Sequence, residues 1–496
     1  MLDKQKLILS KINLTSITKP IKKPLYDLES IKPGIIHLGL GNFHRAHQAL
    51  YLDDLFNMGL DHDWGIVGSG VMSHDAAMRK ALFEQDLLTT VVELEPGANR
   101  VRVIGSMVDF LPVESGNPSL IRSLCNPEIR IASMTITEGG YFIDPATGKF
   151  NPNFPQMIDD SKNLESPNTV FGILVQALKL RRQKGIPPFT VMSCDNLPGN
   201  GKVAKDAVVG LADLSDSKFA RWIEQEVSFP NGMVDRIATV TTDQQREKLI
   251  HEFGIDDQWP VFCEPFRQWV LEDQFSMGRP SFEKVGVTFT KEIEAFELMK
   301  LRILNGGHPI ISYPGALLDM EYVHEPMEHQ LIRDYFIKLE QQEIIPVVPP
   351  VPGTDLQNYF VQIQERFSNP EIGDTIPRIC MDGSNRQPKF ILPSIKDRLN
   401  EGLGIKGLSL EIALWCRYCF GESESGKAIH IDDIHSDRLK KKAREAREQP
   451  TKFLEMDDIF GELANAPVFR EDFSFALKSL WSHGVEKTLQ DYILAN

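Results

Sequence analysis

The stretch Gly34-Ile-Ile-His-Leu-Gly39-Leu-Gly41-Asn-Phe-His44 decides the fold of this 496-residue chain. Its apolar first half predicts a buried β-strand that ends at the glycines. Residues 43–56 follow with helical spacing and predict a helix. Two glycines between a strand and a helix let the backbone approach a pyrophosphate, whose charge a helix N-terminus favours. Because His44 occupies the place of the third glycine in the usual GxGxxG pattern, an ordinary strand-to-helix turn stays an alternative.

The rest of the first 290 residues continues the alternation of strands and helices. Apolar, β-branched runs predict further strands at residues 64–68, 87–94, 100–104, 129–137 and 189–193, and a helix is predicted at 169–182. Strands that alternate with helices favour an α/β domain with a mostly parallel sheet. A strand-like run at 285–290 assigns the preceding stretch to the same domain.

Strands become scarce beyond residue 290. Helical patterns occupy residues 291–304, 328–343, 355–367, 408–420 and 438–448. We therefore predict an N-terminal α/β domain over residues 1–290 and a C-terminal, mainly α-helical domain over residues 291–496.

Composition excludes several classes of protein. The net charge of −15 argues against general nucleic-acid binding and against an anionic membrane surface. No apolar run approaches the roughly 20 residues of a membrane helix, and the N-terminus lacks the apolar region of a signal peptide. Six cysteines are too few for a disulfide framework in so long a chain, so we expect a cytoplasmic protein.

An acidic residue follows the second predicted strand. Asp75 lies after Gly68-Ser-Gly70, where a carboxylate accepts hydrogen bonds from the adenosine ribose and repels a 2′-phosphate. This position favours NAD, whereas the nearby Arg79 and Lys80 would suit NADP. Arg45, just inside the first helix, could add positive charge near the phosphates.

The most informative stretch in the second half is Glu297-Leu-Met-Lys300-Leu-Arg-Ile-Leu-Asn305-Gly-Gly-His308. Glu297 and Lys300 share a helix face, because they are three residues apart. On an ideal α-helix His308 lies about 80° and Asn305 about 140° around the axis from Lys300. The side chains of these four residues could line one cleft if the helix continues past the two glycines. The neighbours of Lys300 are mostly apolar, which predicts a buried helix. A lysine in a buried helix is unusual and indicates a functional role rather than a solvent-exposed position.

A second polar cluster follows the strand predicted at 189–193. It reads Ser193-Cys-Asp195-Asn196-Leu-Pro-Gly, and a carboxylate, Asp235, follows further along. The C-terminal edge of a parallel sheet is where ligands bind. A plain turn of Asp, Asn, Pro and Gly remains the competing interpretation.

These motifs together resemble the polyol-specific long-chain dehydrogenases, the mannitol dehydrogenase family. The shared pieces, in order, are Gly39-x-Gly41-x-Phe43-x-Arg45-Ala46, Thr137-Glu-Gly-Gly140, Cys194-Asp-Asn-Leu-Pro198, Val234-Asp-Arg-Ile237 and Lys300-x4-Asn305-x2-His308. The resemblance runs from about residue 25 to the C-terminus. It implies a Rossmann-type first domain and NAD-dependent oxidation of D-mannitol to D-fructose.

The resemblance also implies the roles of the catalytic residues. Lys300 would be the general base, which requires a pKa below the usual lysine value near 10.4. Asn196 and Asn305 would donate hydrogen bonds to the reacting oxygen. Glu297 would relay the proton to solvent.

The remaining site residues follow from the same resemblance. Asp235, His308, Arg378 and Arg386 would bind the other substrate hydroxyls; the family has a lysine in the segment of Arg386, which leaves fine specificity open. Asp75 matches the position that selects NAD. The other cofactor-binding residues would be Gly39, Gly41, Phe43, Arg45 and Glu138.

Several alternatives stay open. D-Arabinitol oxidation and fructuronate reduction belong to the same family, and a non-catalytic NAD-binding sensor would keep the glycine turn without Lys300. Cys416-x-x-Cys419 lacks a second cysteine pair, so we expect no metal site there. The expected ligand is a small polyol or ketose, with no nucleic-acid or membrane partner, and the chain is expected to be a monomer or a weak oligomer.

Overall fold

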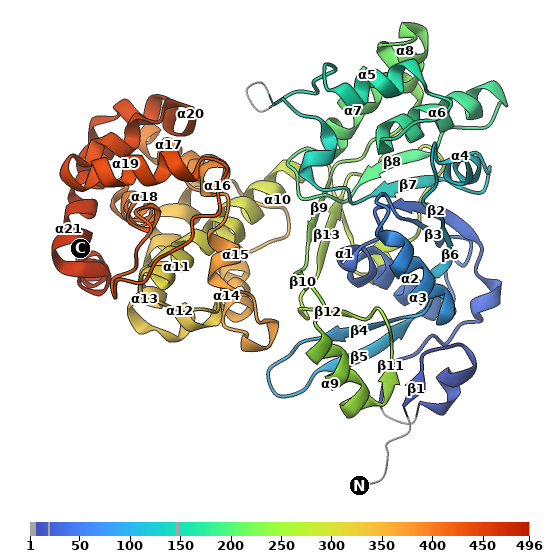
Figure 1. Cartoon of the computed structure of the whole chain (residues 1–496), viewed down its shortest axis with the longest axis horizontal. Helices are drawn as coiled ribbons and strands as arrows, with labels where there is room; N and C mark the ends of the chain where they lie inside the picture. Colours follow the sequence, from blue (N-terminus) through green and yellow to red (C-terminus); the bar gives the residue numbers. More distant parts are fainter. Residues whose placement is uncertain (1–5, 18–19, 145–147, 496) are drawn as a thin grey trace. The chain divides into compact units, whose positions relative to one another are not determined.

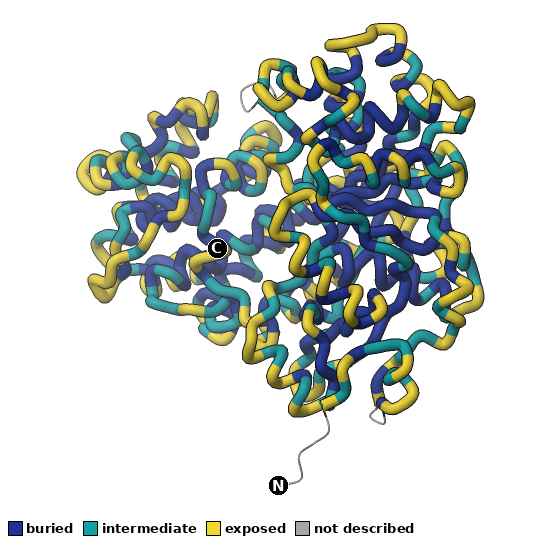
Figure 2. Tube along the Cα trace, turned by 45° about the vertical axis from the view of Figure 1, so that its right-hand side comes forward, coloured by how far each residue is buried: buried dark blue, intermediate teal, exposed yellow. Residues whose placement is uncertain are grey.

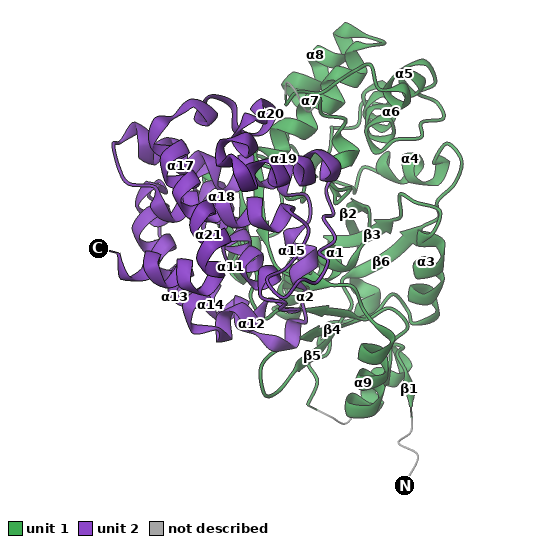
Figure 3. Ribbon diagram, turned by 60° about the vertical axis from the view of Figure 1, so that its left-hand side comes forward, with its two compact units in different colours: residues 1–293 green, residues 294–496 purple. Residues whose placement is uncertain are grey.

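The computed structural model describes residues 6–17, 20–144 and 148–495. The chain divides into two compact units, residues 1–293 and residues 294–496 (Figure 3). Among the described residues, no helix has both the length and the apolar character needed to cross a membrane.

A five-stranded sheet forms the centre of the first unit (Figure 1). Its strands lie in the order β6 (Met107–Leu111), β3 (Gly65–Ser69), β2 (Pro33–Leu38), β7 (Ile131–Met134) and β8 (Thr190–Ser193), and every neighbouring pair is parallel. β2, β3, β7 and β8 are apolar and almost entirely buried, as expected for parallel strands covered on both faces.

Two hydrophobic clusters cover the two faces of this sheet. Successive side chains of a strand point to opposite faces, so Ile35 and Ile36 fall in different clusters. One cluster packs on α4 (Pro118–Leu124), α6 (Val170–Gln183) and α7 (Asn200–Asp213), and the other on α2 (Gln48–Asn57) and α3 (Asp75–Glu84). The buried chain of these layers is dark blue in Figure 2.

Smaller sheets complete the first unit. One is mixed, in the order β10 (Ala238–Thr239), β12 (Val261–Cys263), β4 (Thr89–Glu93) and β5 (Arg100–Ile104). Another has the order β14 (Thr288–Phe289), β13 (Gln268–Leu271) and β9 (Gly232–Asp235). β1 (Leu7–Ile8) pairs with β11 (Ile255–Asp256). Three further helices are α5 (Pro155–Lys162), α8 (Ser217–Glu226) and α9 (Asp243–Phe253).

The second unit is mainly helical, and its described residues, 294–495, contain isolated bridges but no strand. Its longer helices are α11 (Gly306–Leu317), α13 (Gln330–Leu339), α14 (Leu356–Phe367), α18 (Lys406–Cys419), α19 (Ser436–Glu448) and α21 (Pro467–Leu494). Shorter ones include α12 (His324–Glu328), α15 (Ile376–Cys380), α16 (Gly383–Phe390), α17 (Leu392–Asn400) and α20 (Asp457–Phe460). An α/β first part with a parallel sheet and a helical second part confirm the predicted fold class.

Two predicted elements differ from the structure. The helix expected over 43–56 is divided at His47, whose φ of −123° and ψ of −92° are not helical, so α1 (Asn42–Ala46) and α2 are separate. The strand expected over 285–290 is mostly a turn that ends in the two-residue β14, because a 3₁₀ turn occupies Phe282–Val285.

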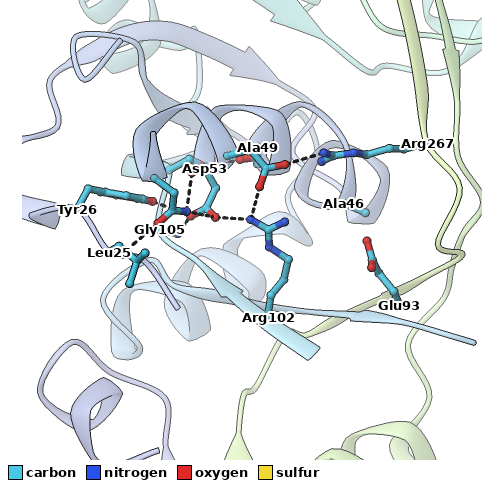
Figure 4. Close-up of polar contacts among 12 residues, drawn as sticks. Leu25, Tyr26, Ala46, Ala49, Asp53, Glu93, Arg102, Gly105 and Arg267 are labelled. Atoms are coloured by element: carbon cyan, nitrogen blue, oxygen red, sulfur yellow. Dashed lines mark hydrogen bonds and ion pairs between the residues drawn. The ribbon is translucent and has the colours of Figure 1, made fainter. Parts of the chain in front are cut away.

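A buried ionic network attaches α2 to β5 (Figure 4). Asp53 is 1% exposed and accepts hydrogen bonds from the Tyr26 hydroxyl at 2.7 Å and the Arg102 guanidinium at 2.6 Å. Arg102 also contacts Asp54 at 2.7 Å, and Arg267 reaches the other oxygen of Asp54 at 2.6 Å. Burial raises the pKa of Asp53, and Arg102 opposes that shift. α2 is thereby held against the mixed sheet that contains β5.

We predict that Arg102→Met lowers the free energy of unfolding by about 3 kcal/mol, because it leaves a buried carboxylate without its cation. Arg246→Met is the matched control, since Arg246 pairs with Asp243 at an exposed site and should contribute little. Urea unfolding of the two variants measures the difference. Equal effects would contradict a stabilising role of the buried network.

Candidate functional site

The glycine turn at the end of β2 makes an unusually close backbone contact. Gly39 has φ +84°, and a Cβ there would lie 2.1 Å from the carbonyl oxygen of Thr135, which follows β7. The N–H groups of Gly39 and Leu40 donate to the Ser69 carbonyl at the end of β3, at 2.9 and 3.2 Å. Only glycine fits at position 39.

Gly41 is the N-cap of α1, and a Cβ there would meet only the Gly39 carbonyl oxygen, at 3.8 Å. A ligand can therefore approach this backbone closely. Together with the position of the turn at the first βα connection, this openness fits a dinucleotide pyrophosphate.

Arg45 points into the protein. It is fully buried and donates to the Gly41 carbonyl at 3.3 Å, to the Asn42 side chain at 2.7 Å and to the Trp259 carbonyl. These bonds hold the glycine turn from the inside, and phosphate binding by Arg45 stays a prediction. Phe43 is partly buried and stacks on His47 at 4.8 Å.

Three buried histidines surround the same turn. The ring of His44 stacks on that of His37 at 3.6 Å, and neither of its nitrogens has a hydrogen-bond partner among the described residues. His37 is within hydrogen-bond distance of Ser133 and Thr135 at 2.8 and 2.9 Å. Burial lowers the pKa of His37 and His47 to about 3, and that of His44 well below its usual range. All three are neutral at neutral pH.

Asp75 begins α3, after the end of β3. Its Oδ2 accepts the backbone N–H groups of Val71 and Met72, both at 2.9 Å. Gly70 lies against this carboxylate, because a Cβ at position 70 would be 2.5 Å from the Asp75 Cβ. The carboxylate therefore orders the loop after β3, and ribose binding by Asp75 stays a prediction.

The segments after β7 and β8 are tied together by Asp195. Its two oxygens accept the N–H groups of Ile136 and Thr137 at 3.0 and 2.9 Å, and the Tyr141 hydroxyl at 2.7 Å. Thr137 has φ 63° and ψ 163°, a region nearly reserved for glycine that costs on the order of 1–3 kcal/mol. Glu138, next to it, and Asn196, next to Asp195, are both exposed.

Asp235 ends β9 and is 4% exposed. Its neighbour Arg236 donates to the Ala46 carbonyl in α1 at 2.7 Å, to Glu93 in β4 at 2.6 Å and to the Glu264 carbonyl at 2.8 Å. Asp235, the carboxylate predicted to bind substrate, is therefore anchored through its neighbour Arg236 to α1, the helix that follows the glycine turn.

The predicted lysine segment of the second unit forms a π-helix. α10 (Ile293–Met299) carries Glu297, the π-helix spans Lys300–Asn305, and the helix continues past the two glycines as α11. Lys300 and Glu297 are each 8% exposed. A π-helix bonds residue i to i+5, and the Gly306 N–H donates to Leu301 in this way. Because a π-helix has more residues per turn, the angle around the helix axis between Lys300 and Asn305 is smaller than the 140° expected for an α-helix.

His308 lies in α11 beyond the π-helix, where its ring stacks on Phe367 at 4.5 Å. Burial is the main cause that lowers the pKa of His308 to about 3; Asp374 opposes it, whereas Arg378 and Arg386 add to it. Arg378 pairs with Asp374, and Arg386 donates to the Ile379 carbonyl at 2.8 Å. A neutral imidazole suits the binding of uncharged hydroxyls, whereas the two guanidinium groups would also suit a carboxylate.

The predicted residues thus occupy both units. The first unit contains Gly39, Gly41, Phe43, Arg45, Asp75, Glu138, Asn196 and Asp235, and the second contains Glu297, Lys300, Asn305, His308, Arg378 and Arg386. Sequence reasoning missed Tyr141 and the contacts of Asp195, for which the only signal was an acidic residue directly after a predicted strand.

In the part of the chain that is described, no group of three or more His, Cys, Asp or Glu side chains could hold a metal ion. Cys416 and Cys419 are buried in α18 with free thiols.

Two family models match this chain. Residues 33–284 match the mannitol dehydrogenase Rossmann domain, and residues 292–481 match the mannitol dehydrogenase C-terminal domain. The chain is 52% identical over 479 residues to a mannitol 2-dehydrogenase of Cereibacter sphaeroides, which covers 97% of this chain and 100% of that protein. It is 40% identical to a mannitol 2-dehydrogenase of Aspergillus terreus, over 95% of this chain and 96% of the relative.

Two solved structures are similar to this chain over nearly its whole length. Pseudomonas fluorescens mannitol 2-dehydrogenase, in a ternary complex with NAD and D-mannitol, has a TM-score of 0.88 and 42% identity, covering 99% of this chain and 100% of that one. A substrate-free D-sorbitol dehydrogenase has a TM-score of 0.91 and 34% identity, covering 97% and 100%.

The buried histidines predict a loss of stability in acid. An unfolded histidine binds a proton near pH 6.5, whereas His44 in the folded protein does so only at much lower pH. Below pH 6.5 the unfolded state therefore binds more protons, and the free energy of unfolding falls as pH falls.

His44→Phe keeps an aromatic ring against His37 and removes the titrating group. We predict that the fall in the free energy of unfolding between pH 6 and pH 5 becomes smaller by up to about 1.4 kcal/mol, the value for one proton. Urea unfolding of both proteins at these pH values measures the change. An unchanged pH slope would contradict the buried, neutral state of His44.

Proposed function

Because the chain belongs to the mannitol dehydrogenase family, we propose that it catalyses the reversible, NAD-dependent oxidation of D-mannitol to D-fructose. The observation that carries this proposal is 52% identity to a mannitol 2-dehydrogenase over essentially the full length of both proteins. The similar structure with bound NAD and D-mannitol supports the same cofactor and substrate.

The glycine turn would hold the dinucleotide. Gly41 leaves the backbone open to its phosphates, Gly39 allows the close turn against Thr135, and Arg45 holds Gly41 from the protein side. Phe43, which stacks on His47, would contact the cofactor. Asp75 would accept hydrogen bonds from the ribose hydroxyls. Glu138, which is exposed after β7, would contact the cofactor. Bound NAD supplies the hydride acceptor for the reaction.

Lys300 would act as the general base. It takes the proton from the C2 hydroxyl of the polyol while the C2 hydrogen leaves as hydride, so that a ketone forms. Glu297, one helical turn earlier, would pass that proton to solvent. The mostly apolar surroundings of this buried helix limit other routes for the proton.

Asn196 and Asn305 would donate hydrogen bonds to the oxygen that gains negative charge as the proton leaves. The π-helix favours this role for Asn305, because it brings its side chain closer to the direction of Lys300 than an α-helix would. Asp235, His308, Arg378 and Arg386 would hold the remaining hydroxyls. No metal ion takes part in this scheme, because Lys300 supplies the base.

A second candidate is oxidation of D-sorbitol, which the similarity to a D-sorbitol dehydrogenase favours. D-Sorbitol differs from D-mannitol only in configuration at C2, so its oxidation at C2 gives the same product, D-fructose. The cytoplasmic location and the monomeric or weakly oligomeric state stay predictions.

A substrate panel distinguishes the candidates. We expect the highest kcat/KM for D-mannitol with NAD among D-mannitol, D-sorbitol and D-arabinitol, and for fructose over fructuronate with NADH. Each assay is repeated with NADP or NADPH. A preference of about a hundredfold for fructuronate or D-sorbitol, the most that a small change in pocket contacts typically gives, would overturn the mannitol assignment.

Lys300→Met tests the general base with a side chain of similar length. We expect kcat to fall by about 10²-fold or more, the usual contribution of a positioned base, while NADH still binds. Lys291→Met, at an exposed position shortly before α10, should keep wild-type kcat. Retention of more than about a tenth of wild-type kcat by Lys300→Met would rule out this role.

Asn305→Ala tests the hydrogen bond to the reacting oxygen. We expect kcat to fall by about 10²-fold with a smaller change in KM, because the bond strengthens as charge develops. Steady-state kinetics with D-mannitol measure both constants. A rise in KM with unchanged kcat would instead place Asn305 in ground-state binding.

A further inference from the structure

Asp195 is placed to control the conformation of the segment after β7. It is 8% exposed, and both of its oxygens accept hydrogen bonds from one short segment, Ile136 to Tyr141. The Tyr141 hydroxyl also lies 2.6 Å from the Ser193 hydroxyl at the end of β8. The ends of two neighbouring parallel strands are thus joined through one carboxylate.

The segment that Asp195 holds contains Thr137 in a conformation that suits glycine. Thr137 has φ 63°, and its β-branched side chain makes this position unfavourable for the isolated backbone. Bonds from the two adjacent N–H groups to one carboxylate compensate, because bonds to a charged acceptor are stronger than neutral ones.

The held segment borders the glycine turn directly. The Thr135 hydroxyl donates to the Gly39 carbonyl at 2.8 Å, and the Thr135 carbonyl is the atom that excludes a side chain at Gly39. Glu138 follows Thr137, so the conformation of Thr137 sets the direction in which Glu138 leaves the sheet. Asn196 follows Asp195 itself.

We propose that Asp195 is a positioning residue that holds Thr137 in its strained conformation and so preorganises the Glu138 segment for the dinucleotide. This inference rests on the proposed function. It adds a residue that does not touch the reacting atoms but determines how well the cofactor is bound.

Asp195→Asn is the primary test. An amide can accept through only one of its two terminal atoms, so the N–H groups of Ile136 and Thr137 can no longer both be accepted. NADH binding, followed by NADH fluorescence without turnover, should weaken about tenfold or more. An affinity within twofold of wild type would overturn the proposal.

Replacement of Thr137 tests whether Asp195 acts through the backbone conformation of Thr137 and not through general stability. Glycine adopts positive φ without a steric penalty, so Asp195→Asn with Thr137→Gly should regain most of the lost affinity for NADH. Asp195→Asn with Thr137→Ala is the matched control, because alanine also removes the hydroxyl and γ-methyl groups of threonine but keeps the Cβ that causes the steric penalty at positive φ. Equal recovery in both double variants, or in neither, would overturn the proposal.

Tyr141→Phe keeps the test decisive if Asp195→Asn does not fold. It removes one of the three donors to Asp195, and should weaken NADH binding by a few-fold, with the same rescue by glycine but not alanine at position 137. Wild-type affinity in Tyr141→Phe, or no difference between the two rescues, would count against the inference.

Failure of the inference can be distinguished from failure of the proposed function. If the wild-type protein binds no NADH, both are wrong. If it binds NADH and oxidises D-mannitol while the variants bind equally well, only the role of Asp195 is wrong. Thermal unfolding of each variant identifies any change in affinity that comes from partial unfolding.

Discussion

The close approach of Gly39 to the Thr135 carbonyl is the constraint on which the rest of the nucleotide-binding unit depends. A side chain at Gly39 would collide with that oxygen at 2.1 Å and push apart the ends of β2 and β7. Because these strands are neighbours in the parallel sheet, their separation decides where the segment after each strand begins. The glycine turn, the strained Thr137 and the Asp195 carboxylate are therefore one connected arrangement.

The fold was predictable where local pattern and burial agree. β5 has the predicted bounds, and β2, β3, β4, β7 and β8 lie within about three residues of theirs, because buried apolar runs mark them. β6, β9, β12 and β13 were missed. β9, β12 and β13 have only three or four residues, too few to show a period, and Asp109 interrupts the apolar run of β6. The break in the helix at His47 could not be predicted either, because the apolar residues on both sides of it keep the spacing of one continuous helix.

The candidate site was predictable in its residue types but not in its geometry. Lysine in an apolar helix and glycines after a strand are visible in the sequence. The π-helix is not, because it changes the hydrogen-bonding partner by one residue without changing the composition of the segment. The inward direction of Arg45 likewise depends on acceptors contributed by Gly41, Asn42 and the distant Trp259.

The two backbone hydrogen bonds of Asp75 have a consequence for protein engineering. If Asp75 accepts hydrogen bonds from the ribose as proposed, a change of cofactor from NAD to its phosphorylated form would require removal of this carboxylate, which repels a 2′-phosphate. Here the same change would also release the amides of Val71 and Met72 and leave Gly70 without the group it packs against. A redesign must therefore rebuild the loop after β3 as a whole, for example by supplying a new cap for these amides together with the new phosphate contact.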